Sequence, residues 1–202
     1  MKKIVLSAIV LLFSGEAISQ TLCGQHHAVI KRSAYRTFGP EAPVATLVAQ
    51  LHQESSCRAD VTSHAGAQGL AQFMPGTATD MARLHPDVCA PANPFSSSWA
   101  ITCRDRYMRD LLRQVGDSAS ESDQWAFALS AYNGGMGWVR RDKAICDITP
   151  GCNSKKYWDN VENVYDRRRS QANIRENRGY PVRIMCVIAP RYDSWGRYVE
   201  CH

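Results

Sequence analysis

The sequence predicts a mainly α-helical fold: a single domain that ends in a short, disulfide-stapled C-terminal appendage. First, apolar side chains recur at helical spacing in several segments, which glycine and proline residues separate. Second, 202 residues are enough for one domain with a sizeable core. Third, 45% of the residues are hydrophobic and 21% are charged, which excludes a disordered chain, a coiled coil and a collagen-like fibre.

Residues 1–19 have the composition of a secretory signal peptide. Lys2 and Lys3 precede an apolar run at 4–13, and small residues follow at the positions that determine cleavage. A membrane anchor is the alternative, but a span needs about 20 apolar residues. We therefore expect an exported protein, periplasmic or extracellular, that contacts a membrane only through this segment.

Eight cysteines follow this segment, and none forms a Cys-x-x-Cys pair. The lack of such a pair argues against zinc, and we expect no metal or other cofactor. An even number of cysteines in an exported chain indicates disulfide bonds. Many pairings are open, and we prefer the set that joins neighbours: Cys23–Cys57, Cys89–Cys103, Cys146–Cys152 and Cys186–Cys201.

The first predicted helix covers residues 41–55. A polar stretch of small residues follows at 63–69, and Thr77 with Asp80 forms a weak capping box for a short helix. The apolar positions of the first helix follow the i, i+3, i+4, i+7 rule: Val44, Leu47, Val48 and Leu51.

Three longer helices are predicted after a loop at 89–98 that is rich in proline and serine. They cover residues 98–115, 122–133 and 154–169, each with apolar residues at helical spacing. Glycines directly follow the first two and favour their ends there.

The C-terminal tail has a different pattern. Residues 182–188 and 196–201 contain β-branched and aromatic side chains on either side of a Pro-Arg-Tyr-Asp turn. This arrangement is typical of a short β-hairpin, which the Cys186–Cys201 disulfide would hold.

Glu54 is the residue that fits a purely structural explanation least well. It lies three residues after Leu51 and seven after Leu47, so it projects from the apolar face of its helix. It also lies at the C-terminal end, where the helix dipole is negative. Burial and the dipole both disfavour the ionised carboxylate, and a neutral carboxyl near pH 7 suits a general acid. The alternative is a glutamate at a frayed helix end that bends out into water.

Other side chains suited to sugar recognition follow in the sequence. Hydroxyl, amide and aromatic groups match a carbohydrate, which has both OH groups and an apolar ring face. Taken singly, each has an ordinary explanation as a turn hydroxyl, a surface amide or a core aromatic. The group comprises Ser55, Ser56, Ser63, Gln68, Gln72, Tyr132 and Asn133.

Three blocks occur in order along the chain: Glu54-Ser55, residues 63–78 with the sequence SHAGAQGLAQFMPGTA, and residues 131–135 with the sequence AYNGG. Together they resemble the soluble lytic transglycosylase (SLT-type) family, lysozyme-like murein-cleaving enzymes of bacteria and their phages. Residues 93–95 and 107–112 are similar to the middle helix of that family.

The resemblance covers about residues 40–165. It implies that residues 20–165 form a lysozyme-like transglycosylase domain and leaves residues 166–202 as a C-terminal extension. It also implies an enzyme, a peptidoglycan lytic transglycosylase whose partners are peptidoglycan glycan strands. We expect a monomer, and no nucleic acid partner, because the protein is exported and its net charge of +5 is modest.

The resemblance implies one catalytic acid, at Glu54. It implies that Ser63 and Gln72 contact the N-acetyl region of the sugar, and that two residues of the AYNGG block line the cleft. Tyr157 lies in a segment similar to a late Tyr-Val helix of the family. The positions expected to bind substrate are Ser63, Gln72, Tyr132, Asn133 and Tyr157.

The chain departs from the family pattern at two places. Ala71 stands where a methionine is usual, and Lys155 and Lys156 stand where some members carry a glutamate. Most glycosidases need two carboxylates, but Asp60 and Asp80 lie in polar turn or cap positions and neither is assigned a role.

A single acid is sufficient if the substrate supplies the remaining groups. Glu54 would protonate the β-1,4 glycosidic oxygen between N-acetylmuramic acid and N-acetylglucosamine. The ionised carboxylate would then accept the proton of the sugar C6 hydroxyl, whose attack on C1 forms a 1,6-anhydromuramic product and gains from proximity.

Two further features have open interpretations. Residues 140–183 contain eleven lysines and arginines against six acids, which would steer the protein to cell-wall carboxylates or anionic lipid, or simply form a solvated helix face. Trp138 is the tryptophan best suited to stack on a sugar ring, although tryptophans are mostly core residues.

Two alternatives to the transglycosylase stay open. One is a hydrolase on the same fold, like a goose-type muramidase. The other is a non-catalytic cell-wall-binding module that keeps the cleft, against which Glu54 argues. The sequence is compatible with a phage endolysin and with a wall-remodelling factor of a secretion or conjugation machine.

Overall fold

The computed structural model describes residues 21–202, so the predicted signal peptide at 1–19 lies outside the described residues. The described part is built from helices and loops and has no named β-strand. The α-helices are α2 (His27–Phe38), α3 (Val44–Ser55), α4 (Pro75–Leu84), α5 (Pro86–Cys89), α6 (Ser97–Val115), α7 (Glu121–Gly134), α8 (Met136–Asp147) and α9 (Gln171–Pro181). The 3-10 helices η1 (Val161–Asn163) and η3 (Ala189–Trp195) and the π-helix η2 (Val182–Ile188) complete the set.

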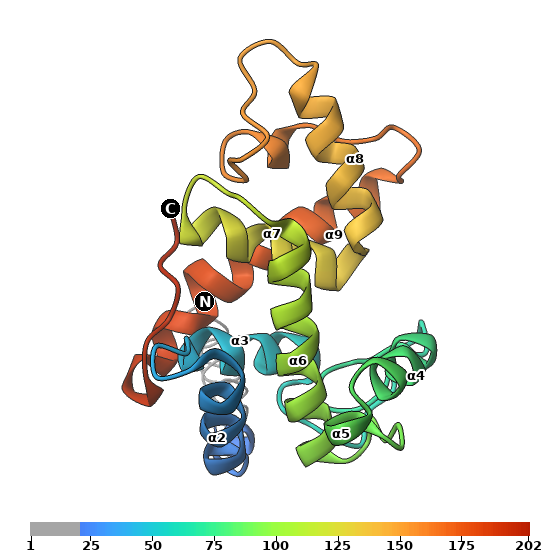
Figure 1. Cartoon of the computed structure of the whole chain (residues 1–202), viewed down its shortest axis with the longest axis vertical. Helices are drawn as coiled ribbons and strands as arrows, with labels where there is room; N and C mark the ends of the chain where they lie inside the picture. The colour runs from blue at the N-terminus through green and yellow to red at the C-terminus, as the bar shows by residue number, and fades with distance from the viewer. Residues whose placement is uncertain (1–20) are drawn as a thin grey trace, which may run out of the picture.

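The long helix α6 organises the molecule. Figure 1 shows α2 and α3 on one side of its lower half, α4 and α5 on the other, and α7, α8 and α9 around its upper end. Helix α6 packs against α2 and α7, and α7 also packs against α8 and α9. The prediction of a mainly helical single domain is confirmed.

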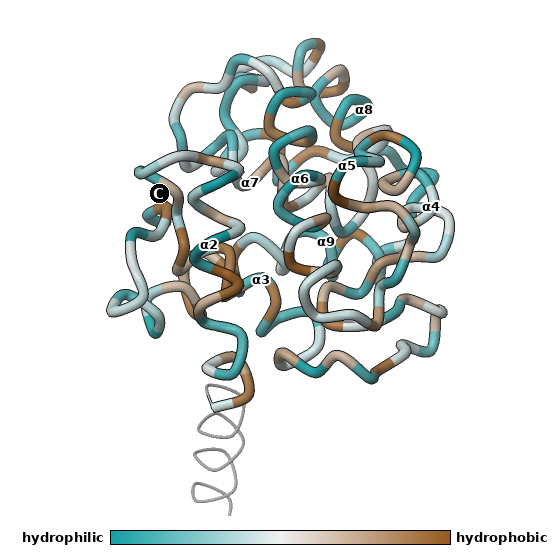
Figure 2. The backbone as a smooth tube through the Cα atoms, turned by 60° about the horizontal axis from the view of Figure 1, so that its bottom comes forward, coloured by the Kyte–Doolittle hydropathy of each residue, from teal (hydrophilic) through white to brown (hydrophobic). Residues whose placement is uncertain are grey.

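Helix α3 passes through the interior of this arrangement. Residues 44–51 are all buried, because α2, η2 and η3 pack around the helix. In Figure 2, hydrophobic stretches of the tube gather where α2 and α3 lie. The sequence pattern predicted one apolar stripe, whereas the structure surrounds α3 and brings only its C-terminal turn to a cavity.

The loop after α3 is fixed to two other parts of the chain. The Ser55 hydroxyl donates a hydrogen bond to the carbonyl oxygen of Leu70 over 2.8 Å. Gly69 has a φ of +70°, and a Cβ atom there would lie 1.8 Å from the carbonyl oxygen of Pro94. Only glycine therefore fits at this position without a shift of the backbone.

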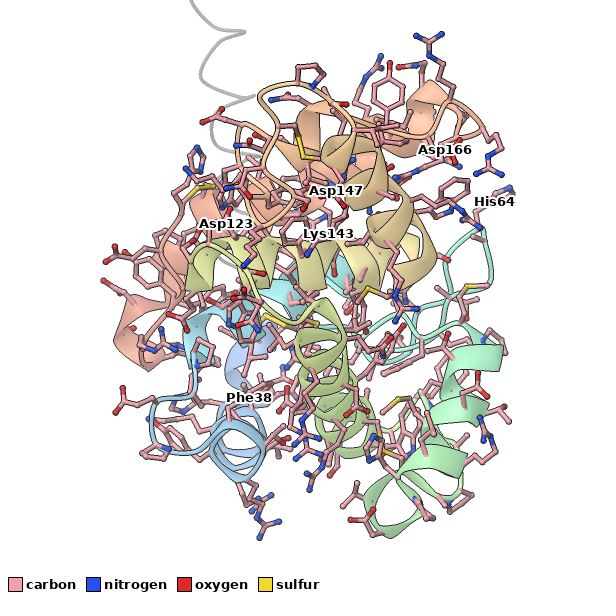
Figure 3. All side chains as sticks on the ribbon, turned by 45° about the horizontal axis from the view of Figure 1, so that its top comes forward. Phe38, His64, Asp123, Lys143, Asp147 and Asp166 are labelled. Atoms are coloured by element: carbon pink, nitrogen blue, oxygen red, sulfur yellow. A yellow bond between two sulfur atoms is a disulfide. The ribbon has the colours of Figure 1, made fainter. Side chains whose placement is uncertain are left out.

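The helix predicted at residues 154–169 is wrong, since this segment is mostly loop with one short turn, η1. The Asp123 carboxylate accepts hydrogen bonds from the backbone N–H groups of Tyr157, over 2.7 Å, and Trp158, over 3.3 Å. Figure 3 shows Asp123 at the beginning of α7. These long-range bonds satisfy backbone donors that a helix would have used within the segment.

The β-hairpin expected in the tail is also wrong. Residues 182–188 form η2, and residues 196–201 have no regular secondary structure and no strand pairing. Three apolar side chains of η2 are buried on one side: Ile184, Met185 and Ile188. Their burial against α3 decides the conformation over the local β-propensity of the tail.

All four predicted disulfides are confirmed: Cys23–Cys57, Cys89–Cys103, Cys146–Cys152 and Cys186–Cys201. Each joins two cysteines that are neighbours in the order of the chain, and no cysteine of the described part is free. The last one ties η2 to the C-terminal end.

No helix between residues 21 and 202 has the length and apolar character that crossing a membrane requires.

Candidate active site

A cavity of about 370 Å³ opens at the C-terminal end of α3. It collects residues from α3, the following loop, α7 and α9, which lie far apart in the sequence. Five residues predicted from sequence line it: Glu54, Ser63, Gln72, Tyr132 and Asn133. The other lining residues are Gln53, Ala65, Ala67, Met74, Glu176, Tyr180 and Arg183.

The Glu54 carboxyl lies at the inner wall of this cavity and is mostly buried. Burial raises its pKa from 4.5 to about 7, because the ionised form loses hydration. The hydrogen bond from Tyr180 and the positive charge of Arg104 lower the pKa of Glu54, and the charge of Glu176 raises it. The net result is a carboxyl that is substantially protonated near neutral pH.

Tyr180, from α9, supplies the direct polar partner of this acid. Its hydroxyl donates a hydrogen bond to Oε1 of Glu54. Burial, followed by the charge of Glu54, raises the pKa of Tyr180 well above its ordinary value, so the hydroxyl keeps its proton. The side chain is 3% exposed, which fixes the position of this donor.

Tyr132 connects the end of α7 to the loop after α3. Its hydroxyl donates to the carbonyl oxygen of Ala71 over 2.7 Å, and its ring lies 5.3 Å from that of Tyr107. Tyr132 thus holds one cavity wall in place while its side chain lines the cavity.

Gln72 and Ser63 are part of the same loop. The Gln72 amide nitrogen donates to the carbonyl oxygen of Gly69 over 2.8 Å, and the residue has a φ of +49°. The Ser63 oxygen accepts from the backbone N–H of Ala67 over 3.0 Å. These bonds engage the Gln72 amide nitrogen and a lone pair of the Ser63 oxygen, so the Gln72 carbonyl oxygen can still accept and the Ser63 hydroxyl can still donate in the cavity that both residues line.

Asn133 is held in its orientation by a residue of α9, Asn177. The amide nitrogen of Asn177 donates to Oδ1 of Asn133 over 3.0 Å and to the carbonyl oxygen of Ser130 over 2.8 Å. Asn177 is 2% exposed. A Cβ atom at Gly134 would lie 2.7 Å from the same amide nitrogen, so the glycine permits this close approach.

Tyr157, expected to bind substrate, does not line the cavity. It is fully buried and packs edge-to-face against Phe127 and Trp158. A side chain without exposed surface cannot contact a sugar, so the structure corrects this assignment. The tyrosine that α9 brings to the cavity is Tyr180.

Sequence reasoning missed the three cavity residues of the tail, Glu176, Tyr180 and Arg183. Residues 166–202 were expected to be an extension of the domain, but α9 packs against α7, and η2 and η3 pack against α3. A signal was present, since Ile174, Asn177 and Tyr180 are buried at helical spacing. This helical spacing was obscured by the basic residues that lie between these positions and by the proline at Pro181.

A second hollow of about 330 Å³ shares Asn133 and Glu176 with the cavity and therefore continues it. Trp138 lines this hollow, but the guanidinium groups of Arg141 and Arg169 lie over its ring at 4.7 and 5.3 Å. The ring is thus already engaged by cations.

Within residues 21–202, one group of three side chains of metal-ligating types lies close together: Cys186, Cys201 and His202, whose ligand atoms are within 4.8 Å of one another. The two sulfur atoms form a disulfide, and none of the three residues lines the cavity.

Comparisons with known proteins point to one family. The family model "Transglycosylase SLT domain" matches residues 33–148, a range that contains Glu54 and four of the other cavity residues predicted from sequence. A soluble lytic murein transglycosylase of Escherichia coli is 33% identical over 106 residues, 52% of this chain and 16% of that protein. A membrane-bound lytic murein transglycosylase F of Pseudomonas fluorescens is 28% identical over 153 residues, 73% of this chain and 29% of that protein.

Solved structures share the fold. The 70-kDa soluble lytic transglycosylase of Escherichia coli superposes with a TM-score of 0.56 at 23% identity, over 83% of this chain and 24% of that one. An inactive variant of the lytic transglycosylase Slt from Pseudomonas aeruginosa gives a TM-score of 0.61 at 22% identity, over 87% and 26%. The chain spans less than a third of the length of these relatives. Because the family model matches more than half of the chain, the protein belongs to the transglycosylase SLT domain family.

Proposed function

We propose that this protein is a peptidoglycan lytic transglycosylase with Glu54 as its single general acid and base. The observation that carries the proposal is the Glu54 carboxyl, whose pKa burial raises to about 7 at the wall of a cavity lined by hydroxyl and amide groups. An acid with a pKa near the working pH is efficient in proton transfer.

In the first step, protonated Glu54 donates to the β-1,4 glycosidic oxygen between N-acetylmuramic acid and N-acetylglucosamine. The bond from C1 to that oxygen breaks, and the 2-acetamido carbonyl of the substrate stabilises the cationic C1. Ser63, Gln72 and Asn133 are proposed to hold the N-acetyl groups by hydrogen bonds, because they line the same cavity.

In the second step, the Glu54 carboxylate accepts the proton of the C6 hydroxyl while O6 attacks C1. This closes the 1,6-anhydro ring and returns the acid to its protonated state, without consumption of water. The attack is intramolecular, which supplies part of the rate through proximity.

Glu176 supports a second candidate, a hydrolase of the muramidase type. This carboxylate lines the cavity with Glu54 and is exposed, so it is suited to orient a water molecule for attack on C1. Among the described residues, Glu54 and Glu176 are the only carboxylates that line this cavity.

The product of cleavage decides between these candidates. Purified peptidoglycan is digested and the released disaccharide is weighed by mass spectrometry. A transglycosylase gives an anhydro product about 18 Da lighter than the hydrolysis product, because no water is added. The hydrolysis product would remove the transglycosylase proposal and direct attention to Glu176.

Glu54→Gln in the same assay tests the acid itself. The amide preserves the shape of the side chain but has no proton to transfer, so the rate is expected to fall by roughly 10²- to 10⁴-fold. Wall clearance equal to that of the wild type would remove Glu54 from the mechanism. A wild type that binds the wall without clearing it would indicate a wall-binding module.

We also propose that the protein acts outside the cytoplasm, in the periplasm or beyond, as a monomer on glycan strands. The signal-peptide pattern at residues 1–19 and four disulfides support this location.

A further inference from the structure

A line of buried hydrogen bonds reaches Glu54 from the interior of the protein. Nη1 of Arg104, on α6, donates to Oε1 of Gln50 over 3.2 Å. Nε2 of Gln50 donates to the hydroxyl oxygen of Tyr180 over 3.4 Å, and that hydroxyl donates to Oε1 of Glu54. Arg104 and Gln50 are 0% and 1% exposed, so water does not compete along this part of the line.

The chemistry of the donors sets the direction of every bond in the line. A guanidinium can only donate, so the oxygen of the Gln50 amide must face Arg104. The amide nitrogen then faces Tyr180 and also can only donate. The hydroxyl hydrogen of Tyr180 is therefore directed away from Gln50 and toward Glu54.

Arg104 is itself held firmly in this orientation. Nη1 also donates to the carbonyl oxygen of Leu47 in α3, and Nε lies 2.9 Å from Oδ1 of Asp105, which is likewise buried. The α3 backbone, one turn before Gln50, thus fixes the beginning of the line.

We propose that Gln50, oriented by Arg104, is a positioning residue for the catalytic acid. It makes the Tyr180 hydroxyl donate permanently to Oε1 of Glu54, and this leaves the acid proton on Oε2, the oxygen free to reach the glycosidic bond. The catalytic part of this inference rests on the proposed function.

The same line stabilises the carboxylate that remains after proton transfer. The hydrogen bond of Tyr180 and the charge of Arg104 lower the pKa of Glu54. The other charged or titratable groups at this carboxyl are Tyr132 from α7, Glu176 from α9 and Arg183 from η2. Because Gln50 couples the two stabilising groups, removing its amide is expected to raise the pKa of Glu54.

The test is a carboxyl titration of the folded chain by carbon NMR with ¹³C-labelled glutamate. The Glu54 signal is identified by its loss in Glu54→Gln. Gln50→Met, close in shape but without the amide, is expected to raise the Glu54 midpoint by about half to one pH unit. Tyr180→Phe is expected to raise it at least as much, and Gln50→Met is expected to add no further shift in the Tyr180→Phe background.

Met108→Leu is the matched control. The Met108 sulfur accepts from Nε2 of Gln50 over 3.5 Å but is not part of the line, so this buried change is expected to leave the midpoint in place. A Gln50→Met midpoint equal to that of the wild type overturns the proposal. The proposal is also overturned if Gln50→Met shifts the Glu54 midpoint by the same amount in the wild-type background and in the Tyr180→Phe background.

A second measurement needs no change at Gln50 and covers the case in which Gln50→Met fails to fold. The side-chain amide signals of Gln50 are compared between wild type and Tyr180→Phe. They are expected to shift, because one N–H loses its acceptor; unchanged signals would overturn the proposal.

The kinetic readout is separate. With purified peptidoglycan, Gln50→Met is expected to lower kcat about tenfold, to change KM by less than about twofold and to move the alkaline limb of the pH profile to higher pH. A wild type without lytic activity would defeat the proposed function, while the titrations would still decide whether Gln50 acts on Glu54 through Tyr180.

Discussion

The Glu54 carboxyl is subject to opposing influences, and their balance sets its chemistry. Loss of hydration favours the neutral acid, whereas the Tyr180 hydroxyl and the distant Arg104 charge favour the carboxylate. Burial is the largest of these, so the pKa of Glu54 rises to about 7. The Tyr180 hydroxyl and the Arg104 charge stabilise the Glu54 carboxylate that exists between the two proposed proton transfers.

This raised pKa predicts a pH-dependent stability difference between wild type and Glu54→Gln. The folded-state pKa of Glu54 is about 7 and the unfolded value is 4.5, so the stability that this group contributes is complete below about pH 4.5. It is lost as the pH rises through about 7, and the loss amounts to about 3 kcal/mol. The Glu54→Gln variant lacks this titrating group, so its free energy of unfolding should rise relative to that of the wild type over this pH range.

Urea unfolding at about pH 4.5 and about pH 8 measures this difference. We compare the urea midpoint of Glu54→Gln with that of the wild type at each pH. We expect this difference to favour the variant more at the upper pH than at the lower pH. Unfolding midpoints that move in parallel with pH would show that Glu54 is not held protonated.

Catalysis is predicted to follow the same titration of Glu54 and to be lost in the same direction of pH. Above about pH 7 the acid is ionised in the free enzyme, so kcat/KM should fall about tenfold per pH unit. Initial rates of peptidoglycan solubilisation between about pH 5 and 9 measure this limb. A rate that stays constant up to about pH 9 would contradict the assignment of Glu54 as the acid.

At the scale of elements, the loop after α3 owes its shape to close backbone contacts. Gly69 approaches the carbonyl oxygen of Pro94, and Tyr132 donates to Ala71 two residues later. Gln72, in the same loop, has a left-handed backbone conformation and lines the cavity. The wall that carries Ser63 and Gln72 is therefore positioned by α7 and by the segment before α6.

Gly69→Ala and Gly66→Ala form a matched pair that tests this contact. Both glycines have positive φ, so each alanine costs about 1 kcal/mol of backbone strain. A Cβ atom at Gly66 meets no atom within 4 Å, whereas the one at Gly69 would collide with the Pro94 backbone. We expect Gly69→Ala to lose about 1–3 kcal/mol more free energy of unfolding than Gly66→Ala.

Denaturant unfolding of both variants gives the comparison, and the lytic rate of Gly69→Ala should fall with it. Equal losses in the two variants would mean that the Pro94 contact relaxes without cost.

Helices could be predicted from the sequence where the apolar residues at helical spacing are also the residues that the fold buries. The helices predicted at 41–55, 98–115 and 122–133 agree with α3, α6 and α7, within the few residues at their ends. The segment at 154–169 had the same apolar spacing but lies in a loop. There the Asp123 carboxylate, more than 30 residues away in the chain, binds its backbone N–H groups.

At the scale of the whole molecule, the C-terminal segment completes the cavity. Helix α9 supplies Glu176 and Tyr180, and η2 supplies Arg183 and packs against α3. The Cys186–Cys201 disulfide ties this segment to the chain end. The tail is thus part of the site that holds the acid.

The disulfides predict an order of stabilities. In the chain-entropy description, a disulfide stabilises more when it closes a longer loop. The sequence separation is 34 for Cys23–Cys57, 15 for Cys186–Cys201 and 6 for Cys146–Cys152. Replacing both cysteines by alanine should therefore cost about 1.5 kcal/mol more for the first pair than for the last.

Thermal or denaturant unfolding of the three double variants measures this order. For Cys186→Ala with Cys201→Ala we also expect a lower lytic rate, since α9 leads directly into η2. The reverse order of stabilities would show that native-state packing, not loop closure, determines the contribution of each disulfide.

The sequence by itself determined the helical class and the position of Glu54 on an apolar helix face, whereas it only favoured the neighbour pairing of the cysteines, which the structure established. These features depend on residues close together in the chain, whose spacing is visible in one dimension. Only the tertiary structure decided that Tyr157 is buried, that Tyr180 binds the acid and that the tail is helical. Each of these depends on which distant segments exclude water together, and no local pattern contains that information.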